Sequence, residues 1–174
     1  MLQLMLLLLV QSAAHAPAPA TTSVIHGEPL LVLPGEARRY RGQQGREGDI
    51  TELLATIEQT GGKLGIFGQT IAPESGPPTH LHRMEVKFAY VDSGDFKFRL
   101  SGQKKWVPVG PFLFIPNMTA HTFKNVGSAP SVLLFGVSAG GFEGVFAERE
   151  RVDAATNMKL WDKYHMQVVG PPID

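Results

Sequence analysis

Residues 76–94 read GPPTHLHRMEVKFAYVDSG, and two of their histidines decide how the chain is interpreted. His80 and His82 stand two positions apart, so in an extended strand both side chains project from the same face. A separate apolar run and turn, residues 111–121, ends at His121, which we expect to supply a third imidazole from a facing strand across a barrel. Imidazole ligands in an apolar β-structure favour Fe, Zn, Cu, Ni or Mn over Mg or Ca, which prefer oxygen. We therefore predict that His80, His82 and His121 bind one metal ion.

Short apolar runs separated by turn residues surround this stretch on both sides. The 174 residues include 19 Gly and 13 Pro, a composition that favours turns over long helices. Residues 95–100, DFKFRL, alternate strictly, as in a strand that buries Phe96, Phe98 and Leu100 on one face. Similar runs occupy residues 51–58, 63–71, 86–91, 112–115 and 131–137. Many short strands at this spacing predict an all-β fold, either a sandwich or a barrel.

Helical spacing of apolar residues is confined to the end of the chain. It begins at Phe142 and continues past Asp153, which is placed to cap the N-terminus of a helix that reaches His165. We expect this C-terminal helical extension, residues 142–166, to pack on the outside of the barrel. The charged residues 148–151 are predicted to be a solvated helix end.

Residues 1–20, MLQLMLLLLVQSAAHAPAPA, have the pattern of a secretory signal peptide. Their apolar run is too short to span a bilayer as a helix, and the small residues after it place the first residue of the mature protein between His15 and Thr21. We expect one mature domain, residues 21–174, secreted or in the secretory pathway, with no membrane association after the signal is removed. An intracellular protein with an extended N-terminal segment is the alternative. Asn117 begins a formal glycosylation sequon.

The charge and the cysteine content exclude several classes of partner and site. Lys plus Arg and Asp plus Glu each number 16, so no basic excess exists to neutralise a nucleic-acid backbone. We therefore expect no nucleic-acid partner. With no Cys, the chain has no disulfide, no thiolate zinc site and no Cys nucleophile. A small molecule remains as the expected substrate.

The two histidine-bearing stretches resemble the paired motifs of the cupin superfamily. The spacing of the second motif is matched by Gly110, Pro116, His121 and Asn125. Met118 stands where that motif usually has Gly. The spacing of the first motif is matched by His80, His82 and Gly94. Lys87, however, stands where the family has a metal-binding Glu. The motif core spans residues 76–125, and the sequence from residue 50 to residue 174 is similar to the single-domain, quercetinase-like (type-2) cupins.

The resemblance implies a double-stranded β-barrel, or jelly roll, with a metal site of three imidazoles and one carboxylate. The ion implied is a redox-capable dication, with Fe(II) favoured and Mn, Cu, Ni or Zn as alternatives. Positions left open on it would take dioxygen and substrate. The resemblance thus implies a dioxygenase-like oxidoreductase acting on a small molecule with an enol, phenol or diketone oxygen. Cupin barrels frequently pair through strands, so a homodimer is a further expectation.

Lys87 and Glu85 are the candidate catalytic residues, and Lys87 leaves three interpretations open. An ammonium near a dication is repelled, so the three His could hold the ion alone while Lys87 orients substrate or moves a proton. A local register shift could instead bring the Glu85 carboxylate to the metal, although such a shift turns a strand's side chains to the other face. In the third interpretation no metal binds, and Lys87 is an acid, base or binding cation beside neutral His. A Lys87 that points outward to pair with Glu85 would have no role in the site.

Because one fold hosts many chemistries, two other function classes stay open. One is a metal-free or non-redox isomerase, cyclase or lyase of a biosynthetic pathway, in which Lys87 and the histidines transfer protons. The other is a non-catalytic binder of a small molecule. The metal content of the purified protein discriminates the oxidoreductase from both.

Overall fold

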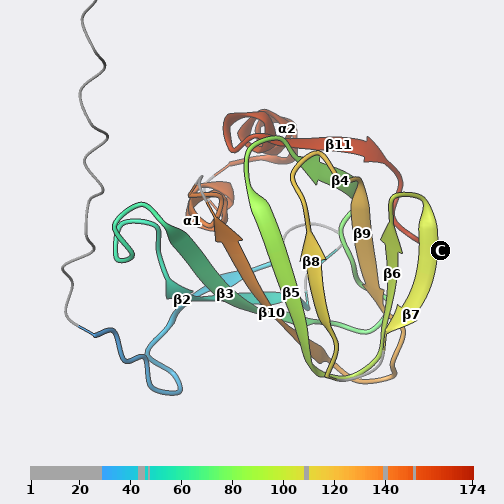
Figure 1. Ribbon diagram of the computed structural model, residues 1–174, viewed down its shortest axis with the longest axis horizontal. Coiled ribbons are helices and arrows are strands. Elements are labelled where there is room, and N and C mark those ends of the chain that lie inside the picture. Colours follow the sequence, from blue (N-terminus) through green and yellow to red (C-terminus); the bar gives the residue numbers. More distant parts are fainter. Residues whose placement is uncertain (1–28, 43–45, 47, 108–109, 139–140, 151) are drawn as a thin grey trace, which may run out of the picture.

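The computed structural model describes residues 29–42, 46, 48–107, 110–138, 141–150 and 152–174. The predicted signal peptide, residues 1–20, lies outside them. The described residues form eleven strands and two short helices, which confirms the predicted all-β class. The strands lie in two sheets that face each other and curve into an open barrel (Figure 1). No helix among the described residues is both long enough and apolar enough to cross a membrane.

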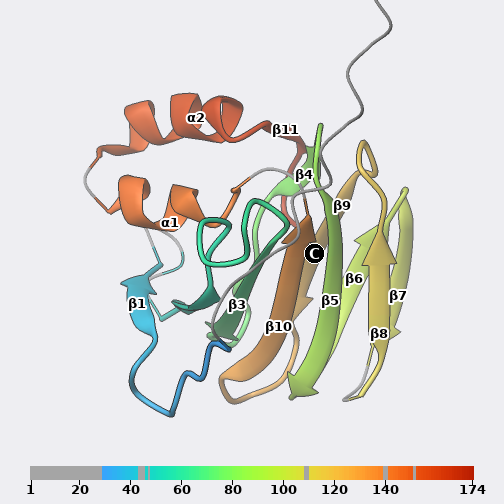
Figure 2. The same cartoon turned by 60° about the vertical axis from the view of Figure 1, so that its left-hand side comes forward.

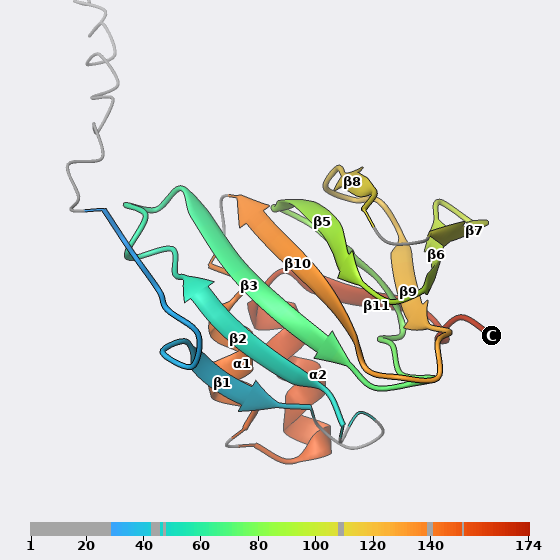
Figure 3. The same ribbon diagram turned by 90° about the horizontal axis from the view of Figure 1, so that it is seen from below.

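Both sheets are antiparallel throughout their described pairings. The first is built from β1 Arg38–Arg41, β2 Ile50–Ala55, β3 Leu64–Ile71, β5 Val86–Ser93, β8 Phe112–Ile115 and β10 Ser131–Ser138. The second is built from β4 Thr79–His82, β6 Phe96–Leu100, β7 Gln103–Val107, β9 His121–Asn125 and β11 Met166–Gly170. The strand orders are β1-β2-β3-β10-β5-β8 and β11-β4-β9-β6-β7. Figure 3 shows β2, β3 and β10 side by side, with β9 and β6 on the other wall.

Alternating apolar residues build the core between the two sheets. Along β3, partly buried and buried residues alternate over the whole strand, and Phe67 and Ile71 are fully buried. Phe96 and Phe98 of β6 are also fully buried, and Leu100 is partly buried against the same core. The predicted inward face of this strand is therefore confirmed. Burying each such aromatic side chain contributes about 1.5–3 kcal/mol relative to exposure.

Two short helices, α1 Gly144–Arg149 and α2 Ala154–Lys163, follow β10 and lie together across one end of the barrel (Figure 2). Asp153 caps α2 as predicted, because its carboxylate accepts a hydrogen bond from the backbone N–H of Thr156 at 2.8 Å. Val145 and Phe146 of α1 are buried in the main core. The helices therefore close this end of the barrel rather than lying loosely on its surface.

The predicted helical extension, residues 142–166, is too long at its C-terminal end. α2 stops at Lys163, and His165 has a left-handed φ of 55°, which does not continue a helix. The chain then forms β11, which pairs with the outer edge of β4. Without β11, that edge of β4 would leave its backbone N–H and C=O groups unpaired. Sheet pairing therefore ends the helix before His165.

Candidate metal centre

The three histidines lie on two neighbouring strands of the second sheet. His80 and His82 are on β4, and His121 is the first residue of β9. His80 and His121 are direct cross-strand partners, and such partners have Cα atoms only about 4.5–5.5 Å apart. The expectation of a facing strand across the barrel is therefore wrong. The chain between them passes through both sheets and returns as β9 beside β4. His121 therefore reaches the other two histidines from the neighbouring strand and not from the opposite wall of the barrel.

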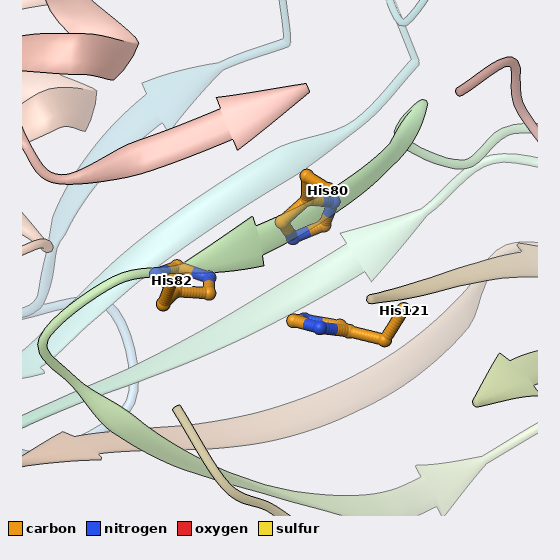
Figure 4. Close-up of side chains that lie close together, drawn as sticks. All are labelled: His80, His82 and His121. Atoms are coloured by element: carbon orange, nitrogen blue, oxygen red, sulfur yellow. The ribbon is translucent and has the colours of Figure 1, made fainter. Parts of the chain in front are cut away.

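The three imidazoles gather at one buried place (Figure 4). One nitrogen of each ring lies within 4.8 Å of those of the other two. The residues are 3%, 2% and 1% exposed in chain order. The ring centroids are 4.3 Å apart for His80 and His121, 5.4 Å for His80 and His82, and 5.6 Å for His82 and His121. The structure thus brings together the three residues that the sequence singled out.

The Nδ1 atoms of two of the rings are already engaged. His80 Nδ1 lies 2.9 Å from the carbonyl oxygen of Pro78, and His121 Nδ1 lies 2.9 Å from that of Thr119. A carbonyl oxygen only accepts, so each Nδ1 carries the proton and each Nε2 keeps a free lone pair. Burial, the largest cause, lowers the pKa of His121 to about 3 and the pKa of His80 well below its usual value. Both rings are therefore neutral ligands at physiological pH.

Several nitrogens of this cluster lack a hydrogen-bond partner within the described part of the chain. Both ring nitrogens of His82 and Nε2 of His121 are buried and unpaired. An unpaired buried polar atom costs about 1–3 kcal/mol, and an ion bound by these lone pairs would remove that cost. Imidazole donors suit Fe, Zn, Cu, Ni and Mn. The residues present therefore fit a transition-metal dication, and three His can bind one.

Glu85 lies in the turn between β4 and β5 and is 1% exposed. One of its carboxylate oxygens is 3.7 Å from Nδ1 of His82, beyond hydrogen-bond distance. Burial raises the pKa of Glu85, but the neighbouring His82 and backbone hydrogen bonding lower it more, so the pKa is lowered overall. β5 pairs with β8 in an unbroken register from Lys87 to Tyr90. The register shift considered above does not occur, and the turn alone places Glu85 beside His82.

Lys87 points into the barrel and is 5% exposed. Its ammonium nitrogen lies 4.2 Å from the centroid of the Phe135 ring and 5.8 Å from that of Phe142. The outward Lys87 that pairs with Glu85 is therefore wrong. Burial and then the charge of Arg46 lower the pKa of Lys87 to about 7, while Glu85 raises it. The Lys87 charge in turn lowers the pKa of His80 and His121, so the amine acts electrostatically on the cluster.

His80 and Lys87 line one pocket that also touches α1, α2 and β11. Its volume is about 400 Å³, including the open mouth. The aromatic side chains of its walls are Phe67, Phe123, Phe142, Phe146 and Trp161. This volume suits a small organic molecule.

Two arginines of this pocket carry no recognisable signal in the sequence. Arg46 precedes β2, and Arg149 is the last residue of α1. Arg149 is only 8% exposed, so the predicted solvated helix end over residues 148–151 is wrong at this position. Its guanidinium lies 5.0 Å from the ring of Phe146. A long apolar stem lets an arginine in a charged stretch be buried when its helix packs on the barrel.

The backbone explains the fixed residues of the two motifs. Gly94 and Gly110 have φ values of 83° and 99°, a region that favours glycine. Met118, where the second motif usually has Gly, has a φ of 58°. Its N–H donates to the carbonyl oxygen of His82 at 2.7 Å, which ties the second motif to the first. Asn125 is fully buried and donates to two backbone carbonyl groups, so its part in the motif is structural.

Residues 68–137 match the Cupin domain family, over a span that contains the three histidines, Glu85 and Lys87. The chain contains a cupin domain. The match includes the site itself, so the cupin resemblance drawn from the two motifs is confirmed. No curated protein matches the sequence, and the quercetinase-like subgroup stays a prediction.

Several solved structures resemble this chain in fold. KdgF from Halomonas sp. is 18% identical with a TM-score of 0.53, covering 62% of this chain and 90% of that chain. An RmlC-like cupin from Shewanella frigidimarina is 17% identical with a TM-score of 0.54, covering 64% and 92%. The polyketide cyclase RemF from Streptomyces resistomycificus is 19% identical with a TM-score of 0.54, covering 63% and 78%. At these identities the likeness concerns the barrel and not the reaction.

Proposed function

We propose that this cupin is a metal-dependent, dioxygenase-like oxidoreductase that acts on a small organic molecule with an enol, phenol or diketone oxygen. The observation that carries the proposal is the buried convergence of three imidazoles, two of them fixed as neutral ligands by backbone carbonyl groups. His80, His82 and His121 would hold the dication, Fe(II) by preference. When bound, such an ion supplies Lewis acidity toward a substrate oxygen and redox chemistry toward dioxygen.

Lys87 supplies the proton chemistry in this proposal. Because its pKa is about 7, a large share of the amine is neutral at physiological pH and can take the proton of an enol or phenol hydroxyl. The rings of Phe135 and Phe142 lie beside the amine, and such apolar surroundings favour its neutral form. Glu85 would act on the site through its charge, since its carboxylate lies 3.7 Å from Nδ1 of His82, too far for a hydrogen bond.

The metal content of the purified protein tests the proposal first. We expect about one Fe, Mn, Cu or Ni per chain, and oxygen consumption with at least one member of a panel containing a 1,3-diketone, a phenol and an enol carboxylate. His121→Ala should abolish both. His165→Asn is the matched control, because His165 lies outside the cluster and Asn tolerates its left-handed φ. Metal-free protein in every preparation and no oxygen uptake would overturn the proposal.

A second candidate function rests on Lys87 itself. A buried amine with a pKa near 7 in a pocket of neutral imidazoles is equipped for proton transfer without any redox step, as in an isomerase, cyclase or lyase. Turnover of an enolisable substrate in the presence of a chelator and without oxygen uptake would favour this function. Ligand binding with no turnover in either condition would favour a non-catalytic binder.

We also propose that the protein enters the secretory pathway and that residues 1–20 are removed. Sequencing the N-terminus of protein recovered from the medium should give a first residue between His15 and Thr21. An intact Met1 would contradict a cleaved signal. Gel filtration with light scattering on the same material tests the proposed homodimer.

A further inference from the structure

The pocket beside the histidine cluster has a cationic lining. Its ionisable residues are Arg46, His80, Lys87 and Arg149. No acidic side chain is among the described residues that line it. Partly buried charges of one sign attract an ion of the opposite sign more strongly than the same charges would in water. The lining therefore indicates an anionic ligand.

Arg46 is neutralised on one side only. Its Nε donates to the carboxylate of Asp49, and that carboxylate also accepts from the Ser75 hydroxyl and the Ala72 N–H. Asp49 is thus held in place by three donors. Arg46 Nη2, in contrast, is buried and has no hydrogen-bond partner within the described ranges. Because Arg46 lines the pocket, a ligand in the pocket can satisfy this donor.

Arg149 comes to the same pocket from a different element, the last turn of α1. Burial and then the charge of Arg46 lower the pKa of Arg149 to about 10, while Asp49 and Glu150 raise it. Arg46 and Arg149 thus place two positive charges in one pocket lining, and these charges repel each other. An anion beside both would reduce this repulsion.

We propose that the substrate enters this pocket as a flat aromatic or unsaturated carboxylate, with its carboxylate group against Arg46 and Arg149. Planar guanidinium groups match a carboxylate in bidentate geometry. Phe142, Phe146 and Trp161 offer aromatic faces in the same pocket, against which a flat ring can stack. This substrate class rests on the proposed function, because the rest of the molecule would extend toward His80, which belongs both to the pocket lining and to the histidine cluster.

Benzoate and benzamide test the charge requirement, because the two molecules have the same shape and differ in charge. We expect calorimetric titration of the protein as purified to show benzoate binding at least ten times more tightly, which equals about 1.4 kcal/mol. Inorganic phosphate at equal ionic strength should bind more weakly than benzoate, since it cannot use the aromatic walls. Equal affinities for benzoate and benzamide would overturn the proposal. Stronger binding of phosphate would overturn the carboxylate class.

Arg149→Gln and Arg46→Gln should each weaken benzoate about tenfold and leave benzamide unchanged. Arg83→Gln is the matched control, because Arg83 forms its ion pair with Asp162 outside the pocket. Arg46→Gln also removes the partner of buried Asp49, so thermal melting must accompany it. If Arg46→Gln does not fold, two measurements still test the proposal. These are the benzoate affinity of Arg149→Gln and the comparison of benzoate with benzamide on the wild type. Unchanged benzoate affinity in folded Arg149→Gln would refute the assignment.

The same titration on His121→Ala separates this inference from the proposed metal function. Benzoate preference that survives in His121→Ala and is lost in Arg149→Gln places the anion at the arginines. Preference that is lost in His121→Ala and kept in Arg149→Gln would mean that benzoate binds a metal ion, and the inference would be wrong. Metal content measured on each sample tests the metal site independently of either result.

Discussion

Replacing Lys87 by Met removes a buried ammonium and keeps a side chain of similar length. Folding lowers the pKa of this amine from 10.5 to about 7. At 1.36 kcal/mol per pKa unit, the charged form is destabilised by as much as about 5 kcal/mol relative to the unfolded chain. Met carries no such penalty and packs well beside the rings of Phe135 and Phe142. We expect Lys87→Met to raise the free energy of unfolding by several kcal/mol near pH 6.5.

The pH dependence gives this prediction its sign. Between pH 7 and pH 10.5 the unfolded chain keeps the proton that folded Lys87 has lost, so wild-type stability rises with pH across this window. Below pH 7 the amine is protonated in both states, and the penalty is constant. The Met variant has no such slope. Its advantage over the wild type should therefore fall by about 2–3 kcal/mol between pH 6.5 and pH 9.

Urea unfolding at several pH values, in the presence of a chelator, measures both quantities. Lys63→Met is the matched control, because Lys63 is exposed in a turn and surface substitutions usually stay within about 0.5 kcal/mol. An advantage of Lys87→Met that is absent at pH 6.5, or that is equal at pH 6.5 and pH 9, would refute the reasoning. If Lys87→Met is more stable than the wild type but has lost turnover, Lys87 serves activity at the expense of stability.

Three further substitutions test the site and its frame. Lys87→Glu should raise the affinity for Mn(II) at least tenfold, because an anion replaces a cation within electrostatic range of the ligands, and equal affinities in a titration would show that this position does not govern the site. His121→Ala should lower the metal content of the protein, measured by elemental analysis, to a small fraction of that in the wild type, and unchanged content would count against the three-His centre. Met118→Gly should stabilise the fold by about 0.5–1 kcal/mol, because the φ of Met118 is 58°, and a lower melting temperature would contradict this.

The parts of the site that the sequence predicts are those set by strand period. Two residues on one strand share a face whatever the rest of the fold does, so the pairing of His80 with His82 follows from spacing alone. The inward face of residues 95–100 follows in the same way. Phe96 and Phe98 are fully buried, as their alternation requires.

The parts that the sequence does not predict depend on how strands and helices pack. Spacing does not say whether His121 stands beside His80 or opposite it, because that choice is made by sheet topology. The end of α2 before His165 depends on a free edge at β4. Arg149 is buried because α1 packs over the barrel end. Glu85 reaches His82 through a turn whose conformation no periodicity describes.

Lys87 connects the two halves of the site electrostatically. The charge of Arg46 lowers its pKa, and a dication on the histidines would lower it further, because like charges disfavour the ammonium form. A carboxylate bound at Arg46 and Arg149 would act in the opposite direction and raise it. Binding of an anionic substrate would therefore raise the pKa of Lys87. The amine would then accept a proton more readily when the substrate's hydroxyl group has to lose one. A lysine in place of the usual glutamate is thus consistent with a cupin domain whose substrate, rather than its protein, brings the negative charge to the site.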